Sequence, residues 1–261
     1  MVENPLKIKL STGEPIFGIW SIIPSPIVAE IFGLSGFDFQ ILDMEHGIFD
    51  LQALDANIRA CESSGCSPLV RVPGVAPFSV QSVLDMGAHG VIFPQVQDVD
   101  AVRAAVRSMK YAPDGNRGYN PFTRVAKYSN PATYENGKLS NYFGLASVIV
   151  ENESALKSLD QILQVPGLDM VYLGVYDMAV SMGCKGNVRD PRVVEFVETT
   201  IGRVRKAGKA AGIMVMNRQD MDRMFHLGAN VIVHAVDSYL IHMVARESIS
   251  AFRESCKASL K

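Results

Sequence analysis

Eight apolar runs of strand length recur along the chain, and a stretch of helical pattern follows each of them. The runs cover residues 17–23, 37–46, 68–74, 91–96, 145–152, 169–177, 212–217 and 230–237. Two parallel strands need a crossover connection, which is usually a helix, so this alternation indicates parallel pairing. Eight such units within 261 residues predict a single-domain (β/α)8 TIM barrel.

A doubly wound open sheet is the structural alternative to the barrel. Sheets of that kind that bind dinucleotides carry a GxGxxG motif after the first strand, whereas this chain reads SIIPSPI there. The second helical stretch has clear boundary signals, with Asp50 as its expected N-cap and Gly65 as its stop. The barrel is therefore the favoured fold.

Residues 111–143 interrupt the alternation. This segment is rich in Gly, Asn, Pro and Tyr, and it is too long for a simple connection in a compact domain. We expect it to form a lid over the site or a loop that contacts a partner subunit.

Composition excludes several function classes. The formal net charge is -2 and the pI is ≈ 6.2, and without a basic block the chain predicts neither nucleic-acid nor membrane binding. No run reaches the roughly 18 apolar residues of a spanning helix, and the opening MVENPLKIKL lacks the apolar core of a signal peptide. The four cysteines form no CxxC pair, so we expect reduced thiols in a cytoplasmic protein.

Ionisable side chains gather where the predicted strands end, which is the edge where TIM barrels place their catalytic groups. The second strand ends in LDMEHG, with Asp43, Glu45 and His46 in close succession. Charged groups at the end of an apolar strand cost desolvation energy unless they have partners or a task. Later strands add four polar residues at the same edge, namely Arg71, Gln95, Glu151 and Asp177.

Glu151 and Asp177 close consecutive predicted strands, which lie about 4.8 Å apart in a parallel sheet. Two carboxylates that close either share a proton or share a cation. With no clustered Cys or His ligands nearby, oxygen ligands favour a hard divalent ion such as Mg²⁺ or Mn²⁺. The alternative is a pair of carboxylates that only cap helices.

His46 is the candidate general base, because an imidazole titrates near neutral pH. Either Asp43 or Asp85 could orient its ring. Arg71 suits a substrate carboxylate or a developing enolate, because its guanidinium is a fixed cation with paired donors. No lysine lies within the eight strands, so a Schiff-base mechanism lacks its nucleophile. The loops after strands seven and eight hold no glycine-rich phosphate cradle, which argues against a phosphosugar isomerase.

Several motifs together resemble the class II pyruvate aldolases of the HpcH/HpaI group. They are LDMEHG, LVRVP, VLDMGA, the Arg117-Gly118 step, and the pair VEN and GVYDMAVSMG, in unchanged order over nearly the whole chain. The resemblance implies a metal-dependent retro-aldol cleavage that releases pyruvate, with aldol addition as the reverse. It implies Mg²⁺ or Mn²⁺, with Co²⁺ as a further option, and no organic cofactor.

The resemblance also implies roles for individual residues. His46 would be the base, supported by Asp43 and Asp85, and Glu151 with Asp177 would hold the metal. The residues expected to contact the substrate are Arg71, Gln95, Tyr176, Asp177 and Trp20. A homo-oligomer, either a hexamer or a trimer of dimers, is implied as well, with the C-terminal helix at 238–257 packing on a neighbouring subunit.

The sequence departs from the family pattern at two positions. Ile149 stands where the family usually has a glutamine, and Tyr176 stands where it has a small residue. We expect metal binding to survive both changes and the acceptor pocket to differ. They leave open oxaloacetate decarboxylation or CoA-thioester lysis on the same fold and metal site, and a non-catalytic barrel is a third reading.

Overall fold

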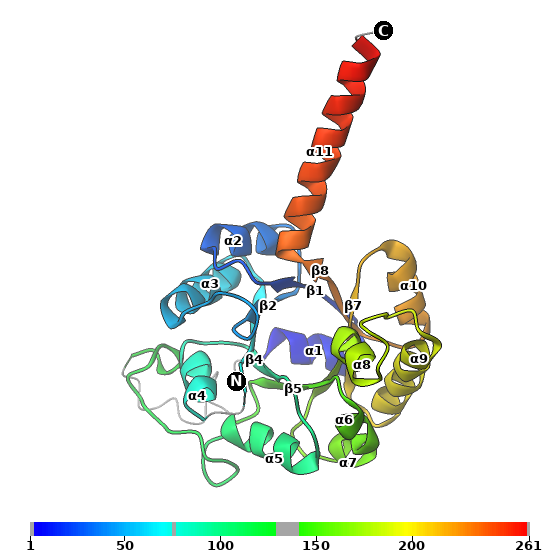
Figure 1. Cartoon of the computed structure of the whole chain (residues 1–261). Coiled ribbons are helices and arrows are strands. Elements are labelled where there is room, and N and C mark those ends of the chain that lie inside the picture. The colour runs from blue at the N-terminus through cyan, green and yellow to red at the C-terminus, as the bar shows by residue number, and fades with distance from the viewer. Residues whose placement is uncertain (1–2, 75–76, 129–140, 260–261) are drawn as a thin grey trace.

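The predicted barrel is confirmed. The computed structural model describes residues 3–74, 77–128 and 141–259, which form a closed barrel of eight parallel strands in chain order (Figure 1). The strands are β1 (Ile16–Ser21), β2 (Phe39–Asp43), β3 (Ser67–Arg71), β4 (Gly90–Phe93), β5 (Leu145–Val150), β6 (Met170–Leu173), β7 (Ala210–Val215) and β8 (Val231–Val236). The helices are α1 (Pro5–Ser11), α2 (Pro26–Leu34), α3 (Leu51–Ser63), α4 (Pro77–Asp85), α5 (Val99–Ser108), α6 (Glu153–Lys157), α7 (Leu159–Leu163), α8 (Val175–Ser181), α9 (Pro191–Lys206), α10 (Arg218–His226) and α11 (Asp237–Ser259), with a short 3-10 turn η1 (Arg124–Ala126).

Two apolar layers hold the barrel together. One fills its interior and includes Phe39, Ile41 and Leu69, while the other lies between the strands and the surrounding helices and includes Leu54 and Ile58. Because both faces of each strand are buried, the strands read as nearly continuous apolar runs. The Asp50 side chain accepts the amide N–H of Ala53 and so caps α3 as predicted.

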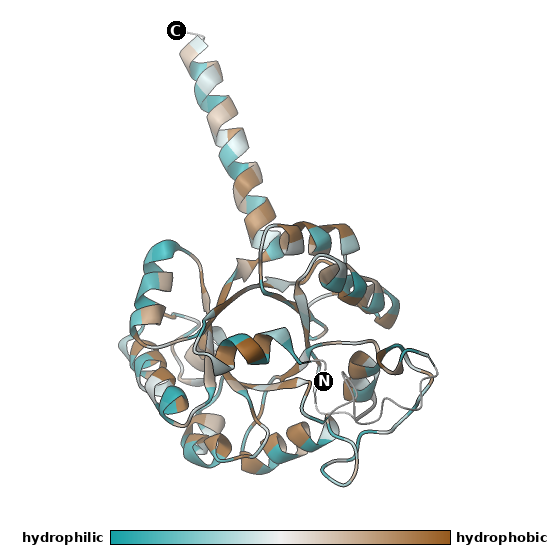
Figure 2. Cartoon of the chain, turned by 180° about the vertical axis from the view of Figure 1, so that it is seen from behind, coloured by the Kyte–Doolittle hydropathy of each residue, from teal (hydrophilic) through white to brown (hydrophobic). Residues whose placement is uncertain are grey.

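Helix α1 closes the amino-terminal end of the barrel (Figure 2). Leu6 belongs to the interior cluster and is buried, and the Asn4 side chain donates to the carbonyl oxygens of His89 and Phe143 at 2.6 and 2.9 Å. We did not predict this helix, because seven residues are too few to show a helical period. Its position leaves the carboxyl ends of the strands as the open end.

Three predicted boundaries differ from the structure. Strand β6 stops at Leu173, and Asp177 lies in the first turn of α8 instead of ending the strand. Strand β2 stops at Asp43, three residues before the predicted end. The helical stretch expected after the strand run at 145–152 is divided at Ser158 into α6 and α7.

The predicted lid segment lies partly outside the described residues, since 129–140 are not among them. Its described part packs along α4, where Arg124 donates to the carbonyl oxygen of Met86 and Gly118 to the side chain of Gln81. None of these described residues lines the cavities at the carboxyl ends of the strands. The lid therefore stays a prediction.

Helix α11 extends away from the barrel (Figure 1). It has 23 residues, and several of its large apolar side chains are exposed, among them Ile241, Val244, Ile249 and Phe252. Within the described part of the chain, no helix combines the length and the apolar character needed to cross a membrane.

Candidate active site

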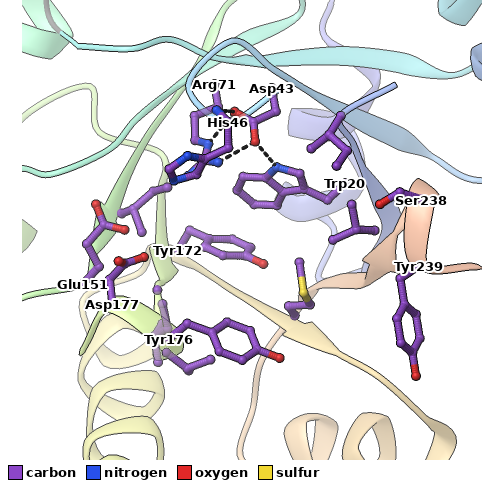
Figure 3. Close-up of a pocket in the computed structure, with 17 residues that line it drawn as sticks. Trp20, Asp43, His46, Arg71, Glu151, Tyr172, Tyr176, Asp177, Ser238 and Tyr239 are labelled. Carbon is purple, nitrogen blue, oxygen red and sulfur yellow. Dashed lines mark hydrogen bonds and ion pairs between the residues drawn. The ribbon is translucent and has the colours of Figure 1, made fainter. Parts of the chain in front are cut away.

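A cavity of about 430 Å³ opens at the carboxyl ends of the strands (Figure 3). Five ionisable residues of the predicted site line it, namely Asp43, His46, Arg71, Glu151 and Asp177, together with Trp20 and Tyr176. An adjoining cavity of about 310 Å³ shares His46, Arg71, Glu151 and Asp177 and adds Glu45 and Gln95. The structure thus brings together all the predicted site residues except Asp85.

Asp43 and Arg71 form the buried ion pair at the base of the site. Strands β2 and β3 end side by side with these two residues in register. The Arg71 Nε and Nη2 atoms donate to the two Asp43 carboxylate oxygens at 2.8 and 2.5 Å, and the Trp20 indole N–H donates to Asp43 at 2.9 Å. Burial by itself would raise the pKa of Asp43, but the hydrogen bonds and charge of Arg71 hold it below its ordinary value.

The Asp43 carboxylate also shapes the turn that carries His46. Its Oδ1 accepts the backbone N–H groups of Glu45 at 2.9 Å and His46 at 3.2 Å. We expected Asp43 to orient the imidazole, and the structure instead assigns it to the backbone of the turn and to Arg71. The His46 side chain is exposed and faces the cavity (Figure 3). Asp43 therefore positions His46 by binding the backbone of the turn that carries it.

Glu45 and Gln95 connect the base side of the site to the acidic side. Glu45 pairs with Arg71 Nη1 at 2.9 Å and accepts a hydrogen bond from the Gln95 amide at 2.7 Å. The backbone N–H of Gln95 donates to Glu151 Oε1. Gln95 has φ 55, a left-handed conformation that costs a non-glycine residue energy, so the contacts of Gln95 with Glu45 and Glu151 hold it there.

Arg71 keeps donors for a ligand despite these contacts. A guanidinium has about five N–H donors; two of them donate to Asp43, and Nη1 forms an ion pair with Glu45. Among the described residues the other N–H groups have no hydrogen-bond acceptor, at a side chain that lines both cavities. Its charge is balanced by two carboxylates, while its position is fixed by Asp43 and by the Trp20 ring, whose centroid lies 4.7 Å from Arg71 Cζ.

Glu151 and Asp177 lie beside each other at one side of the cavity (Figure 3). Burial raises the pKa of Glu151 to about 7, and the negative charges of Asp177 and Glu45 act in the same direction. Carboxylates crowded in this way are stabilised by a cation. Among the described residues, no group of three or more His, Cys, Asp or Glu is arranged to hold a metal ion, so Glu151 and Asp177 are the carboxylates that could hold one here. That donor set fits Mg²⁺ or Mn²⁺, which keep several water ligands.

Asp85 is not beside His46. It is the last residue of α4, which runs back from the open end of the barrel, and its carboxylate accepts a hydrogen bond from Arg117 at 2.6 Å. It lines neither cavity. We expected Asp85 to orient or support His46, but within this chain the helix carries Asp85 away from the site.

The two departures from the family pattern both contact the cavity. Ile149 is buried in the barrel interior, and Tyr176 lies on α8 with 51% of its surface exposed.

Gly174 packs closely against Glu151, because a Cβ added at Gly174 would lie 2.5 Å from the Cβ of Glu151. Only glycine therefore fits beside Glu151 at this position.

Sequence reasoning underestimated two sets of residues. Glu45 was recognised as an ionisable group but was given no role, although it joins Arg71 to Gln95. The apolar lining was missed altogether, namely Ile22, Tyr172, Met214, Val236 and Tyr239. Their positions at or just after strand ends were a usable signal, but apolar side chains do not stand out there.

The fold and the site define a class, a (β/α)8-barrel enzyme with a histidine, a buried arginine and paired carboxylates at its open end. The model of the HpcH/HpaI aldolase/citrate lyase family matches residues 17–243. The chain therefore belongs to this family of carbon–carbon lyases. A hydroxypyruvate/pyruvate aldolase of Roseovarius nubinhibens is 31% identical, covering 96% of this chain and 97% of its own.

Two further comparisons agree with this assignment. A 4-hydroxy-2-oxo-heptane-1,7-dioate aldolase of Shigella flexneri is 32% identical, covering 99% of this chain and 97% of its own. The crystal structure of a family protein from Burkholderia cenocepacia superposes with a TM-score of 0.88 at 29% identity, covering 96% of this chain and 99% of that one.

Proposed function

We propose that this protein is a metal-dependent aldolase that cleaves a 4-hydroxy-2-oxo acid to pyruvate and an aldehyde and catalyses the reverse addition. The observation that carries the proposal is the placement of His46, Arg71, Glu151 and Asp177 around one cavity. The relatives at 31 and 32% identity, both named as aldolases, support it.

The reaction needs one proton transfer and one stabilised charge. In cleavage, the bond between C3 and C4 breaks, its electron pair passes to the pyruvate portion as an enolate, and the 4-hydroxyl loses its proton as the aldehyde forms. His46 faces the cavity and would accept that proton, directly or through a water. Arg71 would bind the substrate carboxylate and the enolate oxygen with its remaining N–H groups. Protonation of the enolate carbon then gives pyruvate.

Glu151 and Asp177 would hold a divalent cation, Mg²⁺ or Mn²⁺ with Co²⁺ as a further option. Such an ion, when bound, supplies positive charge beside the keto oxygen of the substrate. Trp20 would keep Arg71 and Asp43 in place and cover the substrate, while Gln95 would fix Glu151 through its backbone N–H. Tyr176 lines the same cavity and would contact the substrate.

The Asp177→Ala variant tests the proposal. We expect pyruvate release from a 4-hydroxy-2-oxo acid to fall roughly 100-fold or more and its dependence on added Mn²⁺ to disappear. The control is Asp100→Ala, which removes an exposed carboxylate on α5 that pairs only with Arg103 among the described residues. Unchanged turnover of Asp177→Ala, with or without metal, would refute the assignment.

Oxaloacetate decarboxylation would pass through the same enolate, so we expect it as a side activity. If the aldol activity were negligible compared with the decarboxylation activity, decarboxylation would be the main function. A CoA thioester is less favoured, because among the described lining residues only His46 and Arg71 are basic. A non-catalytic barrel would show no proton–deuterium exchange at the methyl group of pyruvate.

We also propose a cytoplasmic homo-oligomer, a hexamer or a trimer of dimers. The four cysteines are free thiols, as expected in a reducing compartment. The exposed apolar side chains of α11 support a contact between subunits, as do Ile27, Ile31 and Leu34, which form one exposed stripe on α2.

A further inference from the structure

The cavity is divided by charge. Its acidic and basic lining residues, Asp43, His46, Arg71, Glu151 and Asp177, gather at one side, and Figure 3 shows Ser238 and Tyr239 at the opposite side, with Trp20 and Tyr172 between. Six lining residues come from the neighbouring strands β6, β7 and β8, from the chain just after β1 and from the helices after β6 and β8. We call them the apolar arm: Ile22, Tyr172, Tyr176, Met214, Val236 and Tyr239.

The arm has no cation to offer a ligand. Its polar atoms are the hydroxyl groups of its tyrosines and of the adjoining Ser238. The Tyr172 hydroxyl is buried and has no hydrogen-bond partner among the described residues. A carboxylate that entered the arm would lose its hydration without gaining an opposite charge, which is strongly unfavourable. An apolar group would instead gain contact with three aromatic rings.

We propose that the apolar arm binds the substituent of the aldehyde, and that this substituent is uncharged and apolar or aromatic. This inference rests on the proposed aldolase function. The pyruvate enolate would lie between Arg71 and the two acidic residues, and the aldehyde carbonyl would face His46. In the addition reaction the methyl carbon of pyruvate loses a proton and bonds to the aldehyde carbon, whose oxygen takes up a proton. The rest of the aldehyde extends past Trp20 toward Tyr239.

A pair of aldehydes of matched shape tests the charge preference. Succinic semialdehyde and 4-methylpentanal share the same reacting end, but the first ends in a carboxylate and the second in an isopropyl group. With pyruvate and Mn²⁺, we expect kcat/KM for 4-methylpentanal to exceed that for succinic semialdehyde about 10-fold or more, and 3-phenylpropanal to be accepted as well. A ratio at or below one would overturn the inference.

Two variants locate the preference in the arm. Tyr239→Arg places a cation in it, and we expect the ratio to fall about 10-fold in favour of succinic semialdehyde. Ile22→Arg provides the same change from another element if the first variant does not fold. The control is Phe225→Ala on α10, whose side chain is 40% exposed, as that of Tyr239 is, and lines neither cavity. A ratio unchanged in both arginine variants would refute the assignment of the arm.

The experiment separates this inference from the proposed function. Wild-type protein is tested in parallel for Mn²⁺-dependent deuterium exchange into the methyl group of pyruvate. Deuterium exchange without a preference for the apolar aldehyde would refute the role of the apolar arm and leave the aldolase proposal standing. Absence of exchange would refute the aldolase proposal, and the inference with it.

Discussion

Arg71 is a buried side chain held by three neighbours in the site. It is 8% exposed, bound to Asp43 and Glu45, and stacked against Trp20. Removing one partner of a buried pair leaves an uncompensated charge, which costs more than the pair contributes. Loss of Asp43 would also release the turn of His46, because one carboxylate holds both. The base and the cation are thus coupled through a residue that need not touch the substrate.

Adding one methyl group at Gly174 should disturb Glu151. In Gly174→Ala the new Cβ would lie 2.5 Å from Glu151 Cβ and 2.9 Å from its Oε2, so Glu151 must move. We expect the affinity for Mn²⁺, measured by isothermal titration calorimetry, to fall roughly 10-fold or more. The control is Gly202→Ala in α9, where an added Cβ meets nothing within 4 Å; it should keep metal affinity and gain about 0.5–1 kcal/mol of stability. Equal metal affinity in both variants would contradict the argument.

At the scale of elements, the sequence was sufficient where periodicity was strong. The eight strands and the cap of α3 at Asp50 could be predicted, because apolar runs and capping residues act locally. The end of β6 could not, since Val175 and Tyr176 continue an apolar pattern although the chain has already turned into α8. Asp177 nevertheless reaches Glu151, because the first turn of that helix lies at the same end of the barrel.

The candidate site was predictable in its residue types but not in its connections. Glu151 and Asp177 could be paired from strand order alone. The contacts of Asp43 with the backbone of its own turn depend on side-chain rotamers that no spacing encodes. Asp85 shows the opposite case, since its place in a predicted helix does not tell which end of that helix faces the cavity. Long-range packing decided each of these cases.

The packing of α3, η1 and the start of β4 yields a prediction on pH. His89 precedes β4 and contacts Glu62 of α3 at 3.2 Å, and Glu62 also pairs with Arg124. Burial, together with the charge of Arg124, lowers the pKa of His89 to about 4. The unfolded chain, with an ordinary pKa near 6.5, therefore binds a proton that the folded protein does not between pH 6.5 and 4. Stability should thus be fully present above pH 6.5 and fall as the pH is lowered, by at most roughly 3 kcal/mol.

His89→Gln isolates this contribution. Urea unfolding between pH 4.5 and 7.5 should show a smaller loss of stability at low pH in this variant than in the wild type. The matched control is His226→Gln, which changes an exposed histidine on α10 and should keep the wild-type slope. Parallel curves for wild type and His89→Gln would show that His89 does not carry the dependence.

At the scale of the molecule, the two ends of the barrel differ: one is closed by a packed helix, and the other carries the polar groups of the site. Helix α1 closes the amino-terminal end, and the polar groups of the site meet at the other. The described part of the chain leaves two apolar helix faces uncovered, on α2 and α11. Exposed patches of this kind usually mark contacts between proteins. Tyr239, at the start of α11, also lines the cavity, so assembly through this helix would bear on the shape of the site.

A charge placed on the apolar face of α11 tests the assembly. Val244 and Phe252 are 65 and 66% exposed, and at about 3.6 residues per turn they share a face with Ile241 and Ile249. In the double variant Val244→Asp/Phe252→Asp we expect light scattering to give a smaller particle than the wild-type oligomer, because burying a carboxylate in an apolar contact is unfavourable. Ser250→Asp adds one charge on the polar side of the same helix and should leave the assembly intact. A monomeric wild type, or a double variant with unchanged mass, would show that this face does not join subunits.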